Sequence, residues 1–274
     1  MASCESCPSK DKCGDKDRDN CMIENNPIND VKHIIGVMSG KGGVGKSTVS
    51  VLLAHDLMKK GYKVGILDAD ITGPSIPRLL GLQDKRATIL ETGIIPVFAD
   101  NGLKVMSLNF LVDEENTPVI WRGPIIAGTV KQFWTDVLWE ELDYLIVDLP
   151  PGTGDVALTV MQVMPLTGVV MVSVPQDMVS MIVAKAINMA KKMNVDVLGV
   201  IENMSYIQCP DCDTQIKMFD GDIKTFLDTA HIPLLGELPM TKSIINVASQ
   251  GINHSDEAMT LFEPITNKII KELE

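Results

Sequence analysis

The chain has 274 residues, of which 45% are hydrophobic, 22% are charged and 4% are aromatic, a composition that excludes a disordered or fibrous protein. This length allows one large α/β domain with an ample core. The formal net charge of −12 argues against a protein that works by neutralising nucleic-acid backbones, because such binding needs clustered Lys and Arg.

Hydropathy and cysteine usage indicate the cellular compartment in which the protein is expected. No apolar run approaches the roughly 20 residues needed to cross a bilayer, and the stretch MASCESCPSKDKCGDKDRDNC has no hydrophobic signal core. We therefore expect a cytoplasmic protein that binds neither membrane nor nucleic acid. Because the cytosol keeps thiols reduced, the six cysteines are not expected to form structural disulfides, and their grouping becomes the informative feature.

The pattern along the chain predicts one folded domain after a short tail. Residues 1–30 are highly charged, carry four cysteines and show almost no apolar periodicity, so they are predicted to be flexible unless a metal orders them. Residues 31–274 alternate short apolar runs with helical patterns. The predicted strands cover 33–38, 63–68, 104–109, 144–149, 168–174, 196–202 and 233–238. The predicted helices cover 46–60, 121–140, 155–163, 177–192, 219–230 and 254–273.

This alternation predicts the fold class. Strand–helix–strand units in series build right-handed crossovers, so we expect an α/β fold whose doubly wound, mostly parallel sheet has helices on both faces. In such sheets ligands bind at the carboxyl ends of the strands.

The first predicted strand leads into GKGGVGKST, which is typical of a phosphate-binding loop. Its glycines let backbone N–H groups face inward around phosphate oxygens, and the start of the following helix adds the positive end of its dipole. Lys46 is predicted to reach the β- and γ-phosphates, and Ser47 to hold Mg²⁺. The predicted nucleotide-binding residues of this loop are Gly40, Lys41, Gly42, Gly43, Val44, Gly45, Lys46, Ser47 and Thr48.

Two later strands end in carboxylates, in GILDADITGPS and LIVDLPPGTGD. Asp68 and Asp70 are two residues apart, so they project toward one side if the strand persists. A lone acidic residue at a strand end is usually a cap or a solvated charge. Three at the edge that carries a phosphate loop are better interpreted as Mg²⁺ and water-positioning groups. Asp68 and Asp148 are the predicted Mg²⁺ ligands, and Asp70 is predicted to orient the attacking water.

Cys209 and Cys212 form the motif CPDC in a predicted loop. This spacing lets two thiolates bind one metal or cluster, but it leaves two positions of a four-coordinate site open. A symmetric dimer could supply both from its partner. A zinc knuckle and a redox dithiol remain alternatives, because CxxC is common to all three kinds of site.

Together, the motifs GKGGVGKST, LDADITGPSIP, WRGP, LDYLIVDLPPGTGD and CPDC resemble those of the Mrp family of iron–sulfur cluster carrier ATPases. This family belongs to the deviant Walker A group of P-loop NTPases, with MinD, the ParA partition proteins and the nitrogenase iron protein. The resemblance covers about residues 30–274. It implies an ATPase that holds a [4Fe–4S] cluster at a homodimer interface and passes it to apo-proteins.

The resemblance also implies individual roles. Lys41 matches the signature lysine that reaches across a nucleotide-sandwich dimer to the partner's phosphates, so Lys41, Lys46 and Asp70 are the implied catalytic residues. Asn203, in VIENMS, matches the position that reads the adenine edge. Cys209 and Cys212 match the pair that bridges the cluster between protomers, and ATP, Mg²⁺ and a [4Fe–4S] cluster are the implied bound groups.

The cysteines of the tail resemble a second cluster motif, found in the eukaryotic nucleotide-binding-protein branch of the family. Cys4, Cys7 and Cys13 follow the C-x2-C-x5-C spacing. In that branch the fourth cysteine precedes this core, whereas here the remaining candidate, Cys21, follows it. An iron–sulfur cluster and zinc both remain open for this tail.

Two other function classes are weighed against the carrier. A spatial organiser of the MinD or ParA kind, with a zinc-binding CxxC, is disfavoured by the acidic charge and by a final helix that lacks a basic face. An electron-transfer reductase is disfavoured because the stretch DLPPGTGDVALTVM contains no cysteine.

Overall fold

The computed structural model describes residues 23, 25–71, 73–112, 123–176, 179–209, 211–212, 214–219, 223–250, 252 and 256–274. The four tail cysteines, Cys4, Cys7, Cys13 and Cys21, lie outside these residues. Metal binding by the tail therefore stays a prediction.

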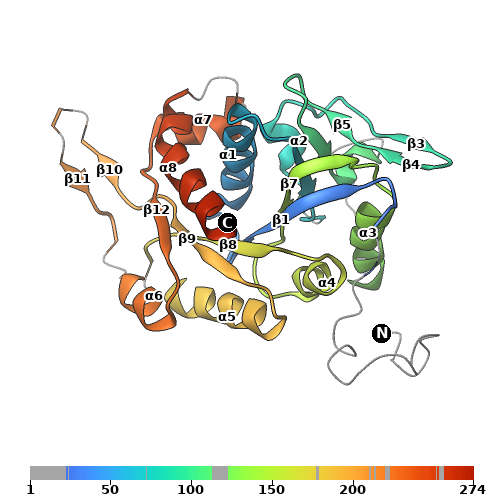
Figure 1. Cartoon of the computed structure of the whole chain (residues 1–274). Helices are drawn as coiled ribbons and strands as arrows, with labels where there is room; N and C mark the ends of the chain where they lie inside the picture. The colour runs from blue at the N-terminus through green and yellow to red at the C-terminus, as the bar shows by residue number, and fades with distance from the viewer. Residues whose placement is uncertain are drawn as a thin grey trace.

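The chain folds around a sheet of eight strands in the order β12-β9-β8-β1-β7-β2-β6-β5 (Figure 1). All neighbouring strands are parallel except the pair β5–β6 at one edge. The mostly parallel sheet expected from the sequence is thus confirmed. The strands are β1 (Asp30–Ser39), β2 (Val64–Asp68), β5 (Val97–Phe98), β6 (Lys104–Met106), β7 (Glu141–Asp148), β8 (Gly168–Ser173), β9 (Val197–Glu202) and β12 (Leu234–Glu237).

Helices cover both faces of this sheet. In Figure 1, α1, α7 and α8 lie on one face and α3, α4 and α5 on the other. Strands β2 and β8 are buried along their whole length, as parallel strands covered on both faces must be. The helices are α1 (Lys46–Lys59), α2 (Ile76–Leu79), α3 (Gly123–Thr135), α4 (Asp155–Val163), α5 (Val179–Lys192), α6 (Lys224–Ala230), α7 (Lys242–Gln250) and α8 (Asp256–Leu273).

Two predicted elements end earlier than the sequence suggested. The strand predicted over 104–109 stops at Met106, and Leu108–Phe110 forms a 3₁₀ turn. The helix predicted over 121–140 ends at Thr135, because the next residues pair with an extended segment. The Ile94 N–H donates to the Asp136 carbonyl at 2.7 Å, and the Leu138 N–H donates to the Ile94 carbonyl at 2.9 Å.

Two hairpins lie outside the central sheet and were not predicted. One joins β3 (Thr88–Leu90) to β4 (Gly93–Ile95), and the other joins β10 (Ile207–Gln208) to β11 (Gln215–Ile216). Strands of two or three residues are too short to show an alternating pattern.

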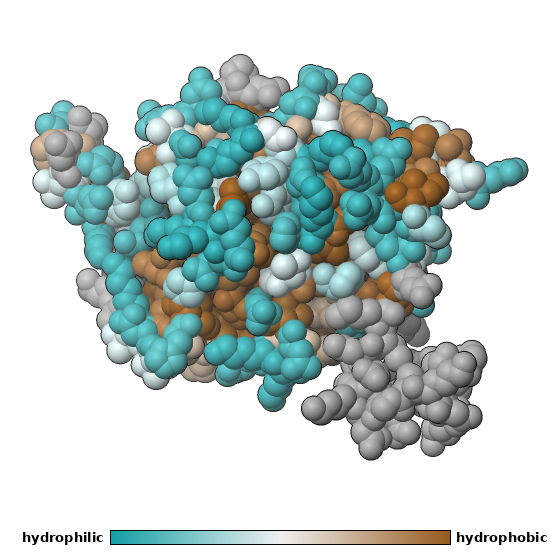
Figure 2. Space-filling view, in the orientation of Figure 1, coloured by the Kyte–Doolittle hydropathy of each residue, from teal (hydrophilic) through white to brown (hydrophobic). Residues whose placement is uncertain are grey.

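The surface in Figure 2 is largely polar, with one hydrophobic area over the β3–β4 hairpin and β5 and another below α8, over β8 and β9. Ile89, Leu90 and Phe98 are exposed there. Within the described part of the chain, no helix combines the length and the apolar character that a membrane span requires.

Candidate functional site

The glycine-rich loop runs from the carboxyl end of β1 to the start of α1, as predicted. Gly43 and Gly45 have φ angles of 79° and 83°, in the left-handed region that favours glycine. Gly45 is also the residue that caps the start of α1. A pocket of about 280 Å³ opens over the loop. It is lined by Ser39, Gly42, Gly43, Gly45, Lys46, Ser47, Thr48, Asp70, Gly73, Ser75, Arg78, Leu79 and Pro151.

The back of the loop rests on Asn203, which follows β9. The Asn203 Nδ2 donates a hydrogen bond of 2.9 Å to the Val44 carbonyl, and both residues are buried. A Cβ added to Gly45 would overlap the same Nδ2 atom, so a glycine is required here for space as well as for conformation. The Oδ1 atom of Asn203 is buried and has no hydrogen-bond partner among the described residues. Asn203, predicted to read the adenine edge, therefore contacts the loop directly in this structure.

Asp148, at the end of β7, gathers the polar side chains at the start of α1. The Lys46 Nζ and the Ser47 hydroxyl each lie 2.6 Å from its Oδ2 atom, and the Ser50 hydroxyl donates to its Oδ1 at 2.6 Å. Asp148 is fully buried, and Lys46 is nearly so. A buried charge requires a partner of opposite sign together with hydrogen bonds, and Asp148 has both.

Asp68, at the end of β2, is the register neighbour of Asp148. Its own burial and the Asp148 carboxylate raise the pKa of Asp68 to about 8, although the nearby Lys46 ammonium acts in the opposite direction. Its oxygens accept hydrogen bonds from the Asp70 and Ile76 N–H groups at 3.2 and 3.3 Å, and from the Ser107 hydroxyl at 3.2 Å. In this structure Asp68 therefore holds the segment between β2 and α2 in place.

Asp70 lies within that segment and lines the pocket. Its Oδ2 atom is 4.0 Å from the Lys46 Nζ. The sequence prediction that Asp68, Asp70 and Asp148 converge beside the loop is thus supported by their positions, while their separate roles stay predictions.

The residues at this edge fit a hydrated Mg²⁺ ion. Mg²⁺ prefers oxygen ligands and usually keeps several waters while it binds one or two protein oxygens and phosphates. The Ser47 hydroxyl and the Asp148 carboxylate supply such oxygens side by side, and Asp68 adds a second carboxylate in register with Asp148.

Lys41 points to a different neighbour from Lys46. Its Nζ donates to the Oε1 atom of Gln176, in the segment after β8. Gly40, just before it, is packed so closely against Ile182 of α5 that a Cβ would clash. This part of the loop is therefore held by α5 and its preceding segment, separately from the Lys46 side.

The CPDC motif lies at the tip of the β10–β11 hairpin, which projects from the body of the molecule (Figure 1). Cys209 is half-buried and Cys212 is exposed, and neither forms a disulfide. The Cys209 N–H donates to the Thr214 carbonyl at 3.0 Å, and the Cys212 thiol lies 3.3 Å from the Thr214 hydroxyl. The Thr214 hydroxyl is also the main cause that lowers the pKa of Cys212.

The hairpin alone does not complete a four-ligand site. Among the described residues there is no cluster of three or more His, Cys, Asp or Glu side chains placed to hold a metal. Two thiolates supply half of the ligands that a tetrahedral zinc or a [4Fe–4S] cluster takes.

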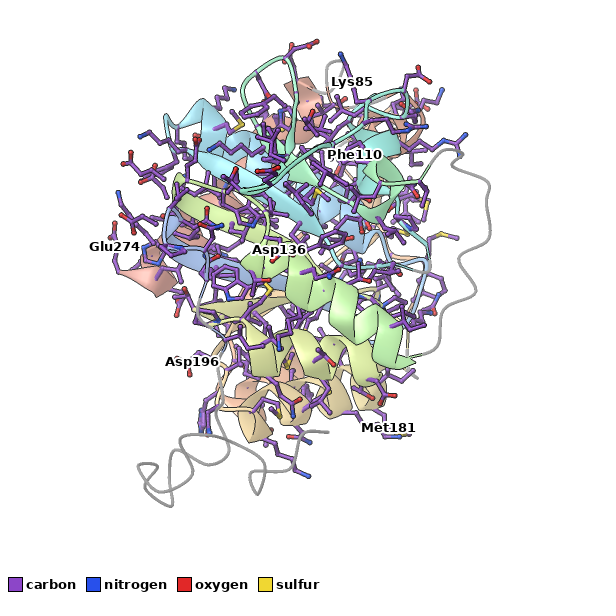
Figure 3. The ribbon with its side chains drawn as sticks, turned by 90° about the vertical axis from the view of Figure 1, so that its right-hand side faces the viewer. Lys85, Phe110, Asp136, Met181, Asp196 and Glu274 are labelled. Atoms are coloured by element: carbon purple, nitrogen blue, oxygen red, sulfur yellow. The ribbon has the colours of Figure 1, made fainter. Side chains whose placement is uncertain are left out.

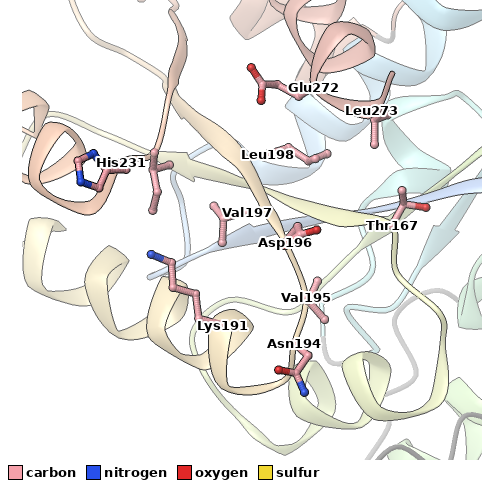
Figure 4. A pocket seen from close by; sticks show the side chains of 11 residues that line it. Thr167, Lys191, Asn194, Val195, Asp196, Val197, Leu198, His231, Glu272 and Leu273 are labelled. Atoms are coloured by element: carbon pink, nitrogen blue, oxygen red, sulfur yellow. The ribbon is translucent and has the colours of Figure 1, made fainter.

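A larger cavity, of about 710 Å³, lies at the opposite end of the sheet (Figure 4). Its lining includes Thr167 and Asp196, which precede β8 and β9, and Lys191 near the end of α5. Figure 3 shows Asp196 and Met181, the latter near the loop-facing start of α5, on opposite sides of the molecule. Because the phosphate loop follows the carboxyl end of β1, this cavity is separate from the candidate nucleotide site.

Several contacts of the site were not predicted from the sequence. Ser50 lies one turn after Lys46 on α1, and this spacing could have identified it. No sequence motif identifies Gln176, Ser107 or Thr214. Their contacts are evident only in the folded structure.

The chain is similar to known proteins over nearly its whole folded body. The family model described as ParA, NUBPL iron-transfer P-loop NTPase, matches residues 30–273. An iron–sulfur cluster carrier protein of Clostridium perfringens is 48% identical over 265 residues, covering 92% of this chain and 93% of the relative. A protein of the same description from Methanocaldococcus jannaschii is 40% identical over 280 residues, covering 99% and 96%.

The fold of this chain is also similar to that of a solved structure. The nucleotide-binding protein of Archaeoglobus fulgidus in complex with ADP is 43% identical, with a TM-score of 0.70, and the match covers 80% of this chain and 86% of that one. These matches span nearly all of the folded body and agree with the resemblance drawn from the motifs. The chain therefore belongs to the NUBPL iron-transfer P-loop NTPases of the ParA family.

Proposed function

We propose that this protein is an ATP-hydrolysing carrier that binds a [4Fe–4S] cluster at a homodimer interface and transfers it to apo-proteins. The observation that carries the proposal is the placement of two sites at one edge of one sheet. The phosphate loop follows the carboxyl end of β1, and the two-cysteine hairpin follows the carboxyl end of β9.

The nucleotide half of the function uses the residues around the loop. Phosphoryl transfer is catalysed mainly by positioning and by neutralising charge on the phosphate oxygens. In the proposed roles, Lys46 exchanges its contact with Asp148 for the β- and γ-phosphates, and Asp70 orients the attacking water. Ser47, Asp148 and Asp68 would hold a Mg²⁺ ion, which would further neutralise charge on the phosphates.

The proposed dimer gives Lys41 its purpose. An ammonium group delivered from one protomer to the phosphates of the other stabilises the transition state only when the two chains meet. The contact between Lys41 and Gln176 keeps this side chain within its own chain, so dimer closure would have to release it.

The carrier half rests on the exposed thiol pair. Two copies of the CPDC hairpin supply four thiolates, the number that a [4Fe–4S] cluster takes. The cluster is a cargo in this proposal, and an exposed position on a projecting hairpin suits its transfer to a client. Residues 1–30 are proposed to form a separate segment that is flexible or binds its own metal.

The test measures iron, acid-labile sulfide and zinc per chain after oxygen-free purification and reconstitution. The wild-type protein should hold iron and sulfide in equal amounts, and Cys209→Ser or Cys212→Ser should remove the share held by the hairpin. A variant with Ser at all four tail cysteines is the matched control, because it should keep that share.

Unchanged iron and sulfide in the two hairpin variants would exclude the proposed ligands. Zinc in place of iron, together with ATP-dependent retention on vesicles or DNA, would favour the spatial organiser instead.

A further inference from the structure

The nucleotide site and the thiol hairpin are joined by a short segment of chain. Asn203 contacts the phosphate loop, and Cys209 begins the CPDC motif, with only residues 204–208 between them. We call residues 203–206 the connecting segment.

Backbone hydrogen bonds fix this segment to the body on both sides. The Asn203 N–H donates to the Ser173 carbonyl at the end of β8, and the Ser205 N–H donates to the Leu238 carbonyl, both at 2.8 Å. The Tyr206 carbonyl accepts a bond of 2.8 Å from the Met240 N–H. The segment is therefore held in a defined path along its whole length, from Asn203 to the start of β10.

The side chain of Ser205 adds a polar anchor. Its hydroxyl donates to the Glu202 carboxylate at 2.7 Å and also lies 3.4 Å from Glu237, which pairs with Lys224 of α6. The base of the hairpin is thus held to the ends of β9 and β12 and to the first turn of α6.

Met204, inside the segment, has an unfavourable backbone conformation. Its φ angle is 54°, a left-handed value that a long side chain such as methionine seldom adopts. Such strain persists only where the surroundings impose it, and it is frequent at switch regions. Here the bonds at Asn203 and Ser205, on either side of Met204, impose it.

Asn203 itself is left incompletely bonded at the loop end. Its Nδ2 holds the Val44 carbonyl while its buried Oδ1 has no hydrogen-bond partner in the described chain. An unpaired buried acceptor raises the free energy of its arrangement. Any change in the loop that offers this oxygen a donor, or that moves the Val44 carbonyl, will shift the position of Asn203.

From these contacts we infer that the connecting segment transmits the nucleotide state of the phosphate loop to the CPDC hairpin, with Asn203 as the input and Met204 as the residue that switches. This inference rests on the proposed function, because it gives the route by which ATP would control the cluster. Asn203 and Met204 act here as positioning residues for Cys209 and Cys212.

The experiment follows the two thiols without any cluster. The rate at which iodoacetamide alkylates Cys209 and Cys212 is measured peptide by peptide in the full-length apo-protein, with and without saturating Mg-ADP. Mass spectrometry separates these thiols from the tail cysteines. Light scattering selects a protein concentration at which the association state is the same in both conditions.

Coupling between two sites typically corresponds to about 5- to 150-fold in an equilibrium. We expect Mg-ADP to change the alkylation rate of at least one hairpin thiol by about fivefold or more. In Met204→Gly, which accepts either backbone conformation, this change should fall to less than about twofold while ADP still binds.

Asn194→Gly is the matched control. Asn194 has a φ angle of 56°, it is exposed, and it lies between α5 and β9 at the opposite end of the sheet. This variant removes a left-handed residue without touching the connecting segment, so it should keep the full nucleotide response.

Equal alkylation rates with and without ADP, at confirmed saturation, would overturn the inference. A response of wild-type size in Met204→Gly would overturn the route through the connecting segment. Neither result bears on whether the hairpin holds a cluster, which the iron and sulfide measurement decides separately.

Discussion

The contact between Gly45 and Asn203 allows a quantitative prediction. An alanine at position 45 must adopt a φ angle of 83°, and the left-handed conformation costs a non-glycine residue about 1–2 kcal/mol. Its Cβ would also overlap the Asn203 Nδ2, so that side chain must move and leave the Val44 carbonyl buried without its donor. Losing that partner costs about 1–3 kcal/mol. Gly45→Ala should therefore lower the free energy of unfolding by about 2–5 kcal/mol.

Two neighbouring glycines separate these contributions. Gly43 has a φ angle of 79° but open space around a new Cβ, so Gly43→Ala should show the conformational cost alone, about 1–2 kcal/mol. Gly42 has open space and no left-handed φ angle, so Gly42→Ala should stabilise the protein slightly, by up to about 1 kcal/mol, through its effect on the unfolded chain. Because all three variants restrict the unfolded chain in the same way, that effect cancels when they are compared with one another.

Urea unfolding of the nucleotide-free proteins measures the three free energies. Asn203→Ala in the Gly45→Ala background completes a double-mutant cycle, and the double variant should be less destabilised than the sum of the single ones, because the overlap has been removed. Equal stabilities of Gly43→Ala and Gly45→Ala, or additive effects in the cycle, would show that Asn203 does not pack against Gly45 as described.

Three further predictions concern the charged groups of the site. Lys46→Ala should destabilise the nucleotide-free protein by about 3–5 kcal/mol in urea, because it leaves the Asp148 carboxylate buried without its cation, and adding Asp148→Asn should restore part of the loss. Between about pH 4 and pH 8 the contribution of Asp68 to the free energy of unfolding should fall by up to about 6 kcal/mol, because folded Asp68 (pKa about 8) retains a proton that the unfolded carboxyl releases near its ordinary value of 3.8. Asp68→Asn, unfolded in EDTA across this range, should flatten that fall, and an unchanged slope would contradict the assignment. Lys41→Ala should still bind ATP in equilibrium titrations but lose about 10²- to 10³-fold in steady-state turnover, and wild-type turnover would remove its proposed role.

The phosphate loop was predictable because its geometry is local. The glycines at 43 and 45 specify left-handed turns, and the strand and helix on either side place Lys46 and Ser47 without reference to the rest of the chain. The carboxylates at the ends of β2 and β7 were also predictable, since parallel strands bring their carboxyl ends to one edge. The sequence therefore identified Asp68 and Asp148 together, and the register of β2 with β7 confirms that they are neighbours.

Contacts between distant parts of the chain could not be predicted. The bond from Asn203 to Val44 joins residues 159 positions apart, and neither of the two motifs that contain them indicates the other as its partner. The helix predicted over 121–140 ends early, at Thr135, for the same reason, because pairing of residues 136–138 with Ile94 outweighs the helical pattern. Short strands such as β10 depend on the partner strand and the turn, so the hairpin that carries CPDC appeared only as a loop.

Residues with a strained backbone indicate where this fold could change conformation. The described part of the chain has four non-glycine residues with positive φ angles, and Glu140, Asn194 and His231 are exposed. Met204 is the half-buried one of the four, and it lies between the phosphate loop and the thiol hairpin. The strands around it, β8 and β9, are buried in a close-packed sheet that resists deformation. A signal between the two sites would therefore pass through the segments that follow the strands, and the connecting segment contacts the phosphate loop at Asn203 and continues directly into β10.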